Sequence, residues 1–224
     1  MKNKLLLLIL LTLHSYTSRS QDTVYFIGNS AVFGMGINQG DYKVWPYKGD
    51  DWSLIPEQKN FIAEYQLNAG KLLKPLSTSY SAFFESGFRV GYQSGKISNG
   101  ADKANYSETY IGVPVAVGVL KKKTAKILKH TIGFTLYGSV IKDVKTASAN
   151  DKSWRFFSQP RGMIFLNTQL LFPSKKSGRY HGVGVEFSND IWFYYKATPI
   201  PFANENMRIG ISLSTFCDFF SYSQ

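Results

Sequence analysis

The chain has 224 residues, a formal net charge of +11 and a single cysteine, Cys217. One cysteine excludes an intramolecular disulfide, so an exported domain of this size must take its stability from a large core or from a membrane. Aromatic residues are abundant, with 17 Phe and 14 Tyr. The positive charge by itself is compatible with nucleic acid, anionic lipid or an acidic protein as a partner.

The N-terminus predicts export. Lys2 and Lys4 precede an apolar run over 5–13, and a small-x-small pattern follows at 18–20. These three features in this order are typical of a secretory signal peptide. The apolar run is far shorter than the roughly 20 residues that a membrane-spanning helix needs, which disfavours the alternative of a retained N-terminal anchor.

We therefore expect a signal peptide over 1–20 and a single mature domain over 21–224. Loss of the three basic residues of the signal peptide, Lys2, Lys4 and Arg19, lowers the net charge from +11 to +8. Export leaves no nucleic acid to bind, so lipid or another protein is the expected partner.

Eight segments predict β-strands, because apolar and polar or small residues alternate along them with a period of two. The alternation is cleanest in the third segment, where Phe88 and Val90 alternate with Arg89 and Gly91. The first segment is apolar on both faces and is the least regular. In chain order the segments are 23–37, 60–70, 82–93, 110–119, 131–140, 163–172, 182–188 and 207–214.

The connections between these segments alternate between long and short, as they do in outer-membrane barrels with long external loops and tight periplasmic turns. Charge follows the same alternation, because the short turns are rich in Lys and Arg and contain no acid, whereas the long loops hold seven of the 15 Asp and Glu residues. Basic turns suit contact with anionic headgroups. The long connections are 38–58, 95–106, 144–159 and 191–205, and the short ones are 73–80, 121–128 and 174–179.

Three features indicate that the apolar faces point to lipid. The opposite faces consist mainly of Gly, Ser, Thr and Ala, which suit a narrow lumen. The longer segments, at 11–15 residues, can cross a bilayer. Aromatic residues near strand ends suggest an interfacial girdle: Tyr65, Tyr92, Tyr110, Trp154, Trp192 and Tyr195. A lipocalin-like soluble barrel with an apolar interior is the alternative.

The predicted fold is thus all-β: a closed antiparallel transmembrane β-barrel of about eight strands in an up-and-down meander. We expect it in the cell outer membrane, in contact with lipopolysaccharide and phospholipid. Five charged residues share its polar face: Glu64, Glu85, Arg89, Glu186 and Arg208. Because an isolated buried ion is costly, we expect them to form a paired luminal network that fills the barrel. The alternative is that some of them reach water at the barrel mouths.

Two long loops combine aromatic residues with proline, a composition that suits a partner or glycan surface. An interfacial girdle with loops packed on one another is the alternative explanation. The residues of this loop hypothesis are Tyr42, Trp45, Tyr47, Trp52, Trp192, Phe193, Tyr194 and Phe202.

The mature chain offers little for catalysis. It has two histidines, His130 and His181, both beside basic turns, and neither has a serine two residues away on its strand face. Two distant histidines and Cys217 match no zinc-site spacing. We therefore expect no catalytic residues, no metal and no cofactor, and an enzyme of the lipid-modifying kind is disfavoured.

One segment, Glu108-Thr109-Tyr110-Ile111-Gly112-Val113-Pro114-Val115, resembles a strand of the PorT-like outer-membrane β-barrel proteins of Bacteroidota. The resemblance also makes a proline inside a strand acceptable, although proline cannot donate to the ladder. The chain departs from the usual outer-membrane ending, since Gln224 rather than an aromatic residue is last.

The resemblance implies an outer-membrane protein, with some members linked to protein secretion, and it implies no catalytic residues. The expected function is a non-enzymatic structural or accessory subunit of a larger outer-membrane assembly or protein-secretion complex. The alternative is a free-standing surface barrel that binds a ligand or glycan through its external aromatic loops.

Overall fold

The computed structural model describes residues 24–38, 43–47, 50–54, 59–77, 79–99, 102–123, 126–145, 150–175, 178–192 and 206–221. The predicted signal peptide lies outside these residues. None of the described segments forms a helix long and apolar enough to cross a membrane.

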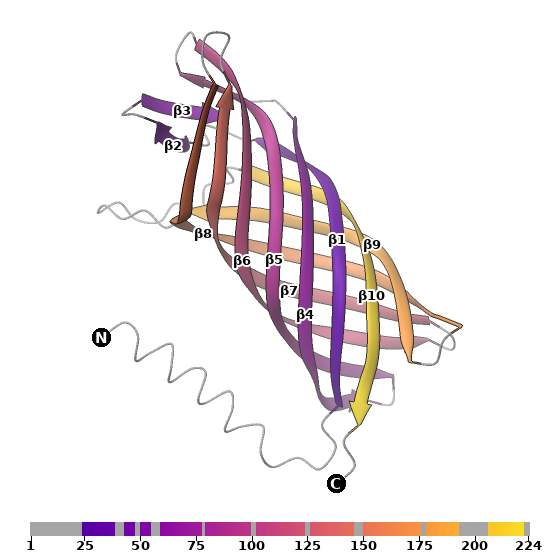
Figure 1. The fold of residues 1–224 in the computed structure, drawn as a ribbon. Coiled ribbons are helices and arrows are strands. Elements are labelled where there is room, and N and C mark those ends of the chain that lie inside the picture. Colours follow the sequence, from indigo (N-terminus) through magenta and orange to yellow (C-terminus); the bar gives the residue numbers. More distant parts are fainter. Residues whose placement is uncertain are drawn as a thin grey trace, which may run out of the picture.

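The described residues form ten strands, and eight of them make the barrel. Each barrel strand pairs antiparallel with both neighbours, and the pairing of β5 with both β4 and β6 closes the ring (Figure 1). The strands are β1 (Val24–Asn38), β2 (Lys43–Tyr47), β3 (Asp50–Leu54), β4 (Lys59–Ser77), β5 (Tyr80–Asn99), β6 (Asp102–Lys123), β7 (Lys126–Lys145), β8 (Asn150–Pro173), β9 (Arg179–Trp192) and β10 (Asn206–Ser221).

The ring order is β1-β4-β5-β6-β7-β8-β9-β10, and β10 returns to β1. Consecutive barrel strands are therefore neighbours in space, which confirms the predicted meander of eight strands. The irregular first segment belongs to the sheet, because β1 pairs with β4 along its length and with β10. Val24, at the start of β1, lies opposite Ser221, at the end of β10. The first barrel strand therefore begins, and the last one ends, at the same end of the barrel (Figure 1).

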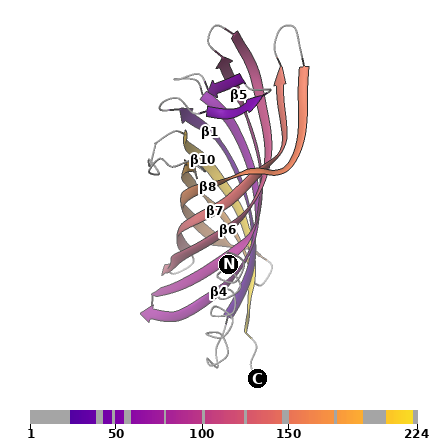
Figure 2. The same cartoon turned by 90° about the vertical axis from the view of Figure 1, so that its left-hand side faces the viewer.

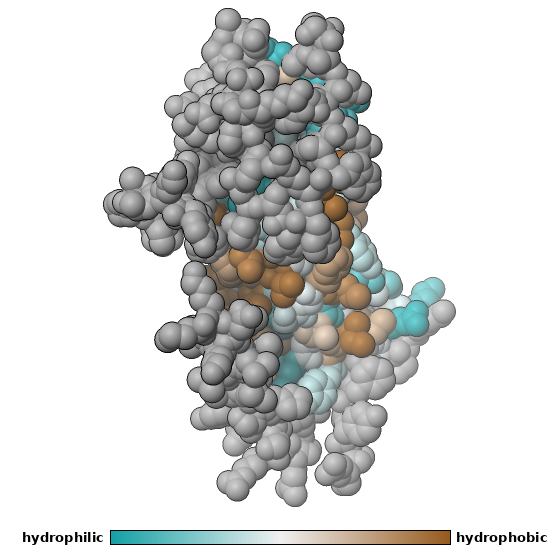
Figure 3. Space-filling model, turned by 60° about the vertical axis from the view of Figure 1, so that its left-hand side comes forward, coloured by the Kyte–Doolittle hydropathy of each residue, from teal (hydrophilic) through white to brown (hydrophobic). Residues whose placement is uncertain are grey.

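The two faces of each strand differ as the alternation predicted. On β6, Val113, Val115 and Val117 are 50%, 44% and 51% exposed, whereas Pro114 and Ala116 between them are buried. The apolar residues therefore face outward. Figure 3 shows hydrophobic side chains gathered over the middle of the visible face of the barrel.

A closed barrel with an apolar exterior needs lipid around it, because soluble monomers rarely expose large continuous apolar patches. A ring of paired strands leaves no free strand edge within the bilayer, which is what a membrane-spanning sheet requires. The structure is therefore an outer-membrane barrel, and the lipocalin-like alternative is wrong. Short turns join the strands at the end where the chain enters and leaves the ring, so this end is periplasmic.

The strands on one side of the barrel are longer than predicted. β5, β6, β7 and β8 have 20, 22, 20 and 24 residues, and most of the predicted long connections 95–106 and 144–159 is strand. These segments lack an apolar face because they lie above the hydrocarbon core of the membrane, so their sequence shows no alternation. Their backbone is instead satisfied by pairing with one another beyond the membrane.

The upper parts of β5 to β8, together with the β2–β3 hairpin, form what we call the external sheet. Leu54 of β3 pairs with Ile97 of β5, and Asn105 of β6 pairs with Lys145 of β7. Register shifts at 109–110 and 137–141 separate it from the barrel proper. Such bulges bend strands, and Figure 2 shows these strand ends rising beyond the rest of the barrel.

A charge placed on the outward face should distinguish the lipid-facing wall from the external sheet. We expect Val115→Arg to lower the free energy of unfolding by about 2–4 kcal/mol, because it puts a cation against lipid. Asn105→Arg, on the outward face of the same strand but above the membrane, should change it by less than about 1 kcal/mol. Urea unfolding in phospholipid vesicles measures both, and equal effects would contradict the assigned membrane position.

Candidate functional site: the filled lumen

The lumen is occupied by side chains in successive layers. An aromatic layer lies near the periplasmic end, amides and hydroxyls lie above it, a central ion-pair network follows, and a further Arg–Glu pair lies towards the external sheet. We describe the central network first because it joins the most strands.

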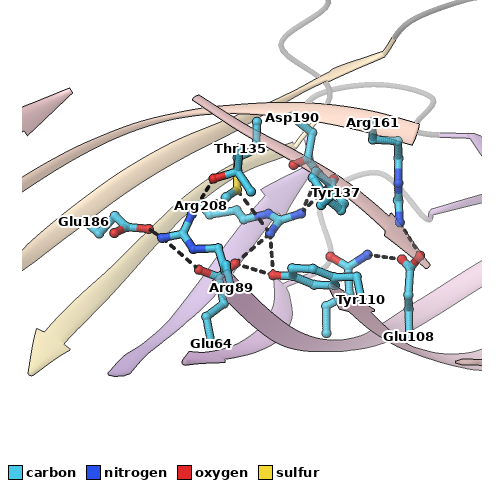
Figure 4. A network of polar contacts seen from close by, with 12 residues as sticks. Glu64, Arg89, Glu108, Tyr110, Thr135, Tyr137, Arg161, Glu186, Asp190 and Arg208 are labelled. Atoms are coloured by element: carbon cyan, nitrogen blue, oxygen red, sulfur yellow. Dashed lines mark hydrogen bonds and ion pairs between the residues drawn. The ribbon is translucent and has the colours of Figure 1, made fainter. Parts of the chain in front are cut away.

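The central network consists of two arginines and three carboxylates (Figure 4). Arg89 of β5 donates to Glu186 of β9 at 2.5 Å and lies 3.4 Å from Glu64 of β4. Arg208 of β10 donates to Glu64 at 3.1 Å and to Asp190 of β9 at 2.6 Å. All five residues are buried. Glu64 thus lies between the two guanidinium groups and joins their ion pairs into one unit.

Neutral groups complete this network. The Tyr110 hydroxyl of β6 donates to Glu64 and accepts a hydrogen bond from Arg208 at 2.9 Å. Asn167 of β8 donates to Glu186 at 2.8 Å, and Arg89 donates to Thr135 of β7 at 3.4 Å. Buried charges are tolerated when their polar atoms find such partners. The network therefore ties together side chains from β4 to β10 around the ring.

A second ion pair lies closer to the external sheet. Glu108 of β6 accepts hydrogen bonds from Arg161 of β8, Ser139 of β7 and the Tyr106 hydroxyl. Gln93 of β5 also donates to Glu108, at 2.8 Å. One buried carboxylate thus links β5, β6, β7 and β8 just below the point where these strands leave the barrel.

A third ion pair lies near the periplasmic end, inside an aromatic layer. Lys129 of β7 donates to Glu85 of β5 at 2.7 Å. Its ammonium group is 4.4, 5.0 and 5.8 Å from the ring centres of Phe216, Phe83 and Phe26. Cations are attracted to aromatic faces at such distances. The three rings and this one cation occupy the barrel near its periplasmic mouth.

Luminal glycines make room for these large side chains. A Cβ atom on Gly91 would lie 2.1 Å from the ring of Tyr110, and one on Gly70 would lie 2.1 Å from the ring of Phe26. Each aromatic ring therefore occupies the space above a glycine on a neighbouring part of the wall. The small residues on the inward faces of the strands therefore leave space for the large side chains that fill the lumen.

Two spaces between these layers, both lined by residues that the structure describes, are small. One cavity of about 10 Å³ is bordered by Asn68, Lys129 and Asn167, and another by Glu64, Glu186 and Arg208. A volume of this size holds about one water molecule. The lumen is packed like a protein core, with ion pairs in place of much of the apolar contact.

The structure brings together four of the five predicted luminal charges, namely Glu64, Arg89, Glu186 and Arg208. Glu85 faces the lumen too, but it pairs with Lys129 in the aromatic layer. Sequence reasoning missed Lys129, Glu108, Arg161 and Asp190. All four continue the luminal alternation of their strands beyond the predicted strand ends, so longer strands would have included them.

Tyr110 was assigned to the interfacial girdle, and this assignment is wrong. Its side chain is fully buried in the lumen, because it shares the inward face of β6 with Gly112 and Pro114. Tyr65 and Tyr92 do face outward, at 50% and 40% exposure. The luminal aromatic and sulfur side chains were not expected, and Tyr137, Met163 and Phe165 are also buried there.

The residues of the loop hypothesis are placed only in part. Trp45 and Tyr47 belong to β2, Trp52 belongs to β3, and Trp192 is the last residue of β9. The others lie outside the described residues, namely Tyr42, Phe193, Tyr194 and Phe202. The proposal that these aromatic residues bind a partner or ligand therefore stays a prediction.

The groups considered for catalysis face outward. His130 makes a hydrogen bond with Thr168 at 3.0 Å, and His181 makes one with Thr215 at 3.3 Å. Cys217 is exposed. Within the described residues no three His, Cys, Asp or Glu side chains are placed to hold a metal ion.

No family model matches the chain, and no curated protein matches it. Among solved structures, Neisserial surface protein A shares 10% identity with a TM-score of 0.44, over 87% of this chain and 97% of that one. Ail, the attachment invasion locus protein of Yersinia pestis, shares 8% with a TM-score of 0.40, over 88% and 99%. The outer membrane protease OmpT of Escherichia coli shares 9% with a TM-score of 0.39, over 90% and 98%.

Breaking the central network should strongly destabilise the barrel. We expect Arg89→Met to lower the free energy of unfolding by about 3–5 kcal/mol, because it leaves Glu186 and Glu64 buried without their cation. Adding Glu64→Gln and Glu186→Gln should recover part of this loss, since the uncompensated charges are then removed. Urea unfolding in lipid vesicles measures each variant.

The matched control for this experiment is Lys126→Met, which removes an exposed cation near the periplasmic end. It should change the free energy of unfolding by no more than about 0.5 kcal/mol. A loss below about 1 kcal/mol for Arg89→Met would show that the network does not support the fold.

Proposed function

We propose that the chain is a sealed, non-enzymatic outer-membrane barrel that serves as a structural or accessory subunit of a larger outer-membrane assembly. The observation that carries this proposal is the filled lumen, in which the Arg89–Glu64–Arg208 network lies between two further ion pairs. A barrel packed in this way has no open interior for a substrate. Its external sheet and its outer wall are then the surfaces that remain for function.

The external sheet supports a role in docking. Pairing between β8 and β9 begins at Arg161, so over 150–160 β8 pairs with β7 and, within the described part of the chain, with no strand on its other side. A free strand edge offers backbone donors and acceptors to a partner strand.

The PorT-like resemblance supports the narrower proposal of a role linked to protein secretion. The resembling segment, 108–115, lies within β6. The β5–β6 ladder lacks the two pairs that would join Gly87 and Phe88 to Pro114 and Val113, and Ser86 donates to the Pro114 carbonyl at 2.8 Å instead. A side-chain hydrogen bond thus accommodates the proline of the motif within the wall.

The second candidate is a free-standing barrel that binds a ligand or glycan. It is favoured by the position of the β2–β3 hairpin, which carries Trp45 and Trp52 and joins the external sheet through β5. A hairpin held in this way presents an aromatic-rich segment on the outer side of the membrane. Native purification separates the two candidates, because a subunit should be purified with stoichiometric partner proteins and a free-standing barrel should be purified alone.

If the lumen is sealed, the purified protein should produce no steady conductance in planar lipid bilayers. The reason is that an ion would have to displace the buried Arg89 and Arg208 side chains and their partners to pass. Single-channel recording over a range of voltages measures this, and an open 16- to 18-stranded porin serves as the positive control. Steady, reproducible conductance steps would contradict the sealed barrel.

A subunit of an assembly should leave the membrane with its partners. We expect a tagged chain, extracted in mild detergent, to co-purify with at least one protein in stoichiometric amount by native mass spectrometry. Replacing Trp45 and Trp52 with Ala should reduce that co-purification at least about tenfold if they form a hot spot. The matched control replaces Tyr80 and Phe172, at the periplasmic end, with Ala and should retain the partner.

A lone barrel in this experiment would contradict the subunit proposal and favour the second candidate. Unchanged co-purification of the Trp45→Ala, Trp52→Ala variant would instead exclude docking through the β2–β3 hairpin.

A further inference from the structure

The outer wall carries a groove of about 470 Å³ at the base of the external sheet. Its lining comes from the outward faces of β4 to β7. A volume of this size is within the range of small-molecule sites, about 300–1,000 Å³. The side chains that matter below are Phe61, Tyr92, Lys96, Asn105, Asp143 and Lys145.

The groove lies where the outward face changes from apolar to charged. Ascending β5, the outward residues are Phe88, Val90, Tyr92, Ser94 and Lys96, and β6 passes in the same way from Val113 to Asn105 and Lys103. Aromatic residues such as Phe61 and Tyr92 are typical of the boundary between hydrocarbon and headgroups. The lower rim of the groove is therefore continuous with the lipid-facing wall, and its upper rim reaches into the headgroup layer of the outer leaflet.

Charge on the upper rim favours an anion. Lys96 and Lys145 line the groove, and Lys103 lies two residues above Asn105 on the same face of β6. The nearby acid is Asp143, whose Oδ2 atom is 3.6 Å from the Lys145 ammonium group. Because Lys145 is 57% exposed, this pair is weak and leaves the lysine available to a phosphate.

Asp143 adds a second chemical requirement. Its Oδ1 atom is buried and accepts no hydrogen bond from the described residues. Such an acceptor beside lysines suits a ligand that carries a hydroxyl or amide N–H close to its anionic group. Phosphorylated amino sugars have this combination, whereas a simple phosphodiester headgroup such as that of phosphatidylethanolamine has no sugar.

We propose that the groove binds the phosphorylated sugar headgroup of an outer-leaflet glycolipid. Lys96 and Lys145 contact the phosphate, Asp143 accepts a hydrogen bond from the sugar, and Phe61 and Tyr92 line the start of the acyl chains. The volume accommodates a sugar phosphate, while the chains extend down the apolar wall. This inference goes beyond the proposed function, because it holds whether or not a protein partner docks on the external sheet.

The test uses diphosphorylated lipid A as the probe, with its monophosphorylated form and phosphatidylethanolamine for comparison. Native mass spectrometry of the full mature chain in detergent micelles gives the fraction of protein with lipid bound. Wild-type protein should retain diphosphorylated lipid A best and phosphatidylethanolamine least. The Lys96→Gln, Lys145→Gln variant should bind diphosphorylated lipid A about tenfold more weakly, since each lysine near the headgroups contributes appreciably.

The matched control is Lys122→Gln, Lys126→Gln, which removes two exposed lysines at the periplasmic end and should bind as wild type does. Asp143→Leu should lower the preference for lipid A over phosphatidylethanolamine, because the acceptor for the sugar is lost. Urea unfolding confirms that each variant is folded, which is expected because all of these side chains lie outside the lumen.

Three results would overturn the proposal. The first is equal lipid A binding by wild type and by the Lys96→Gln, Lys145→Gln variant. The second is an equal loss in the periplasmic control, which would indicate unselective attraction to charge. The third is displacement of the lipid by millimolar inorganic phosphate, which would indicate a simple anion site.

Discussion

The Glu64 carboxylate between Arg89 and Arg208 is the interaction on which the rest of the barrel depends. It lies 3.4 and 3.1 Å from the two guanidinium groups, of which Arg89 reaches Glu186 across the lumen and Arg208 reaches Asp190 on the neighbouring strand. On the outer wall an apolar side chain is about as stable against lipid as against a neighbouring apolar side chain. Contacts on that face therefore do not specify which strands pair. The buried ion pairs can specify strand pairing, because displacing one partner of a pair lowers the stability of the barrel by several kcal/mol. The interior thus sets the register of the ring, while the exterior sets its depth in the membrane.

This division explains the composition of the wall. Large luminal side chains need space, and glycines such as Gly91 below Tyr110 provide it at the wall itself. Small residues alone would leave a water-filled lumen, and large residues alone would not fit eight strands. The combination gives a core in which charges, aromatic rings and backbone lie in contact. A barrel built in this way leaves little room for a ligand between the luminal side chains that the structure describes.

The sequence predicted the parts of the fold that contact lipid and missed those that do not. Alternation along 60–70, 82–93 and 110–119 reveals a wall with one apolar face, and it placed Glu64 and Arg89 in the lumen. The alternation ends where the lipid ends, so Glu108, Arg161 and Lys129, which continue the inward face beyond the apolar stretch, lay between the predicted strands and the predicted connections and were assigned to neither. Tyr110 was misassigned because an aromatic residue near a strand end is typical of a girdle, and only the register with β5 shows that it lies over Gly91. The upper parts of β5 to β8 were missed for the same reason, since strands paired in water need no period of two.

The boundary at which the apolar alternation stops also determines where the outer wall changes from apolar to charged. Where alternation stops, the outward face of β5 and β6 passes from Phe88 and Val113 to Lys96 and Asn105 within a few residues, and the bulges near 109–110 and 137–141 bend the strands at this height. A bend at the membrane surface creates a hollow, and the hollow combines an apolar rim with a cationic one. A lipid with a large anionic headgroup matches both rims at once. The filled lumen supports this region from inside, because the contacts of Glu108 with Arg161 and Gln93 join β5, β6 and β8 directly below the groove.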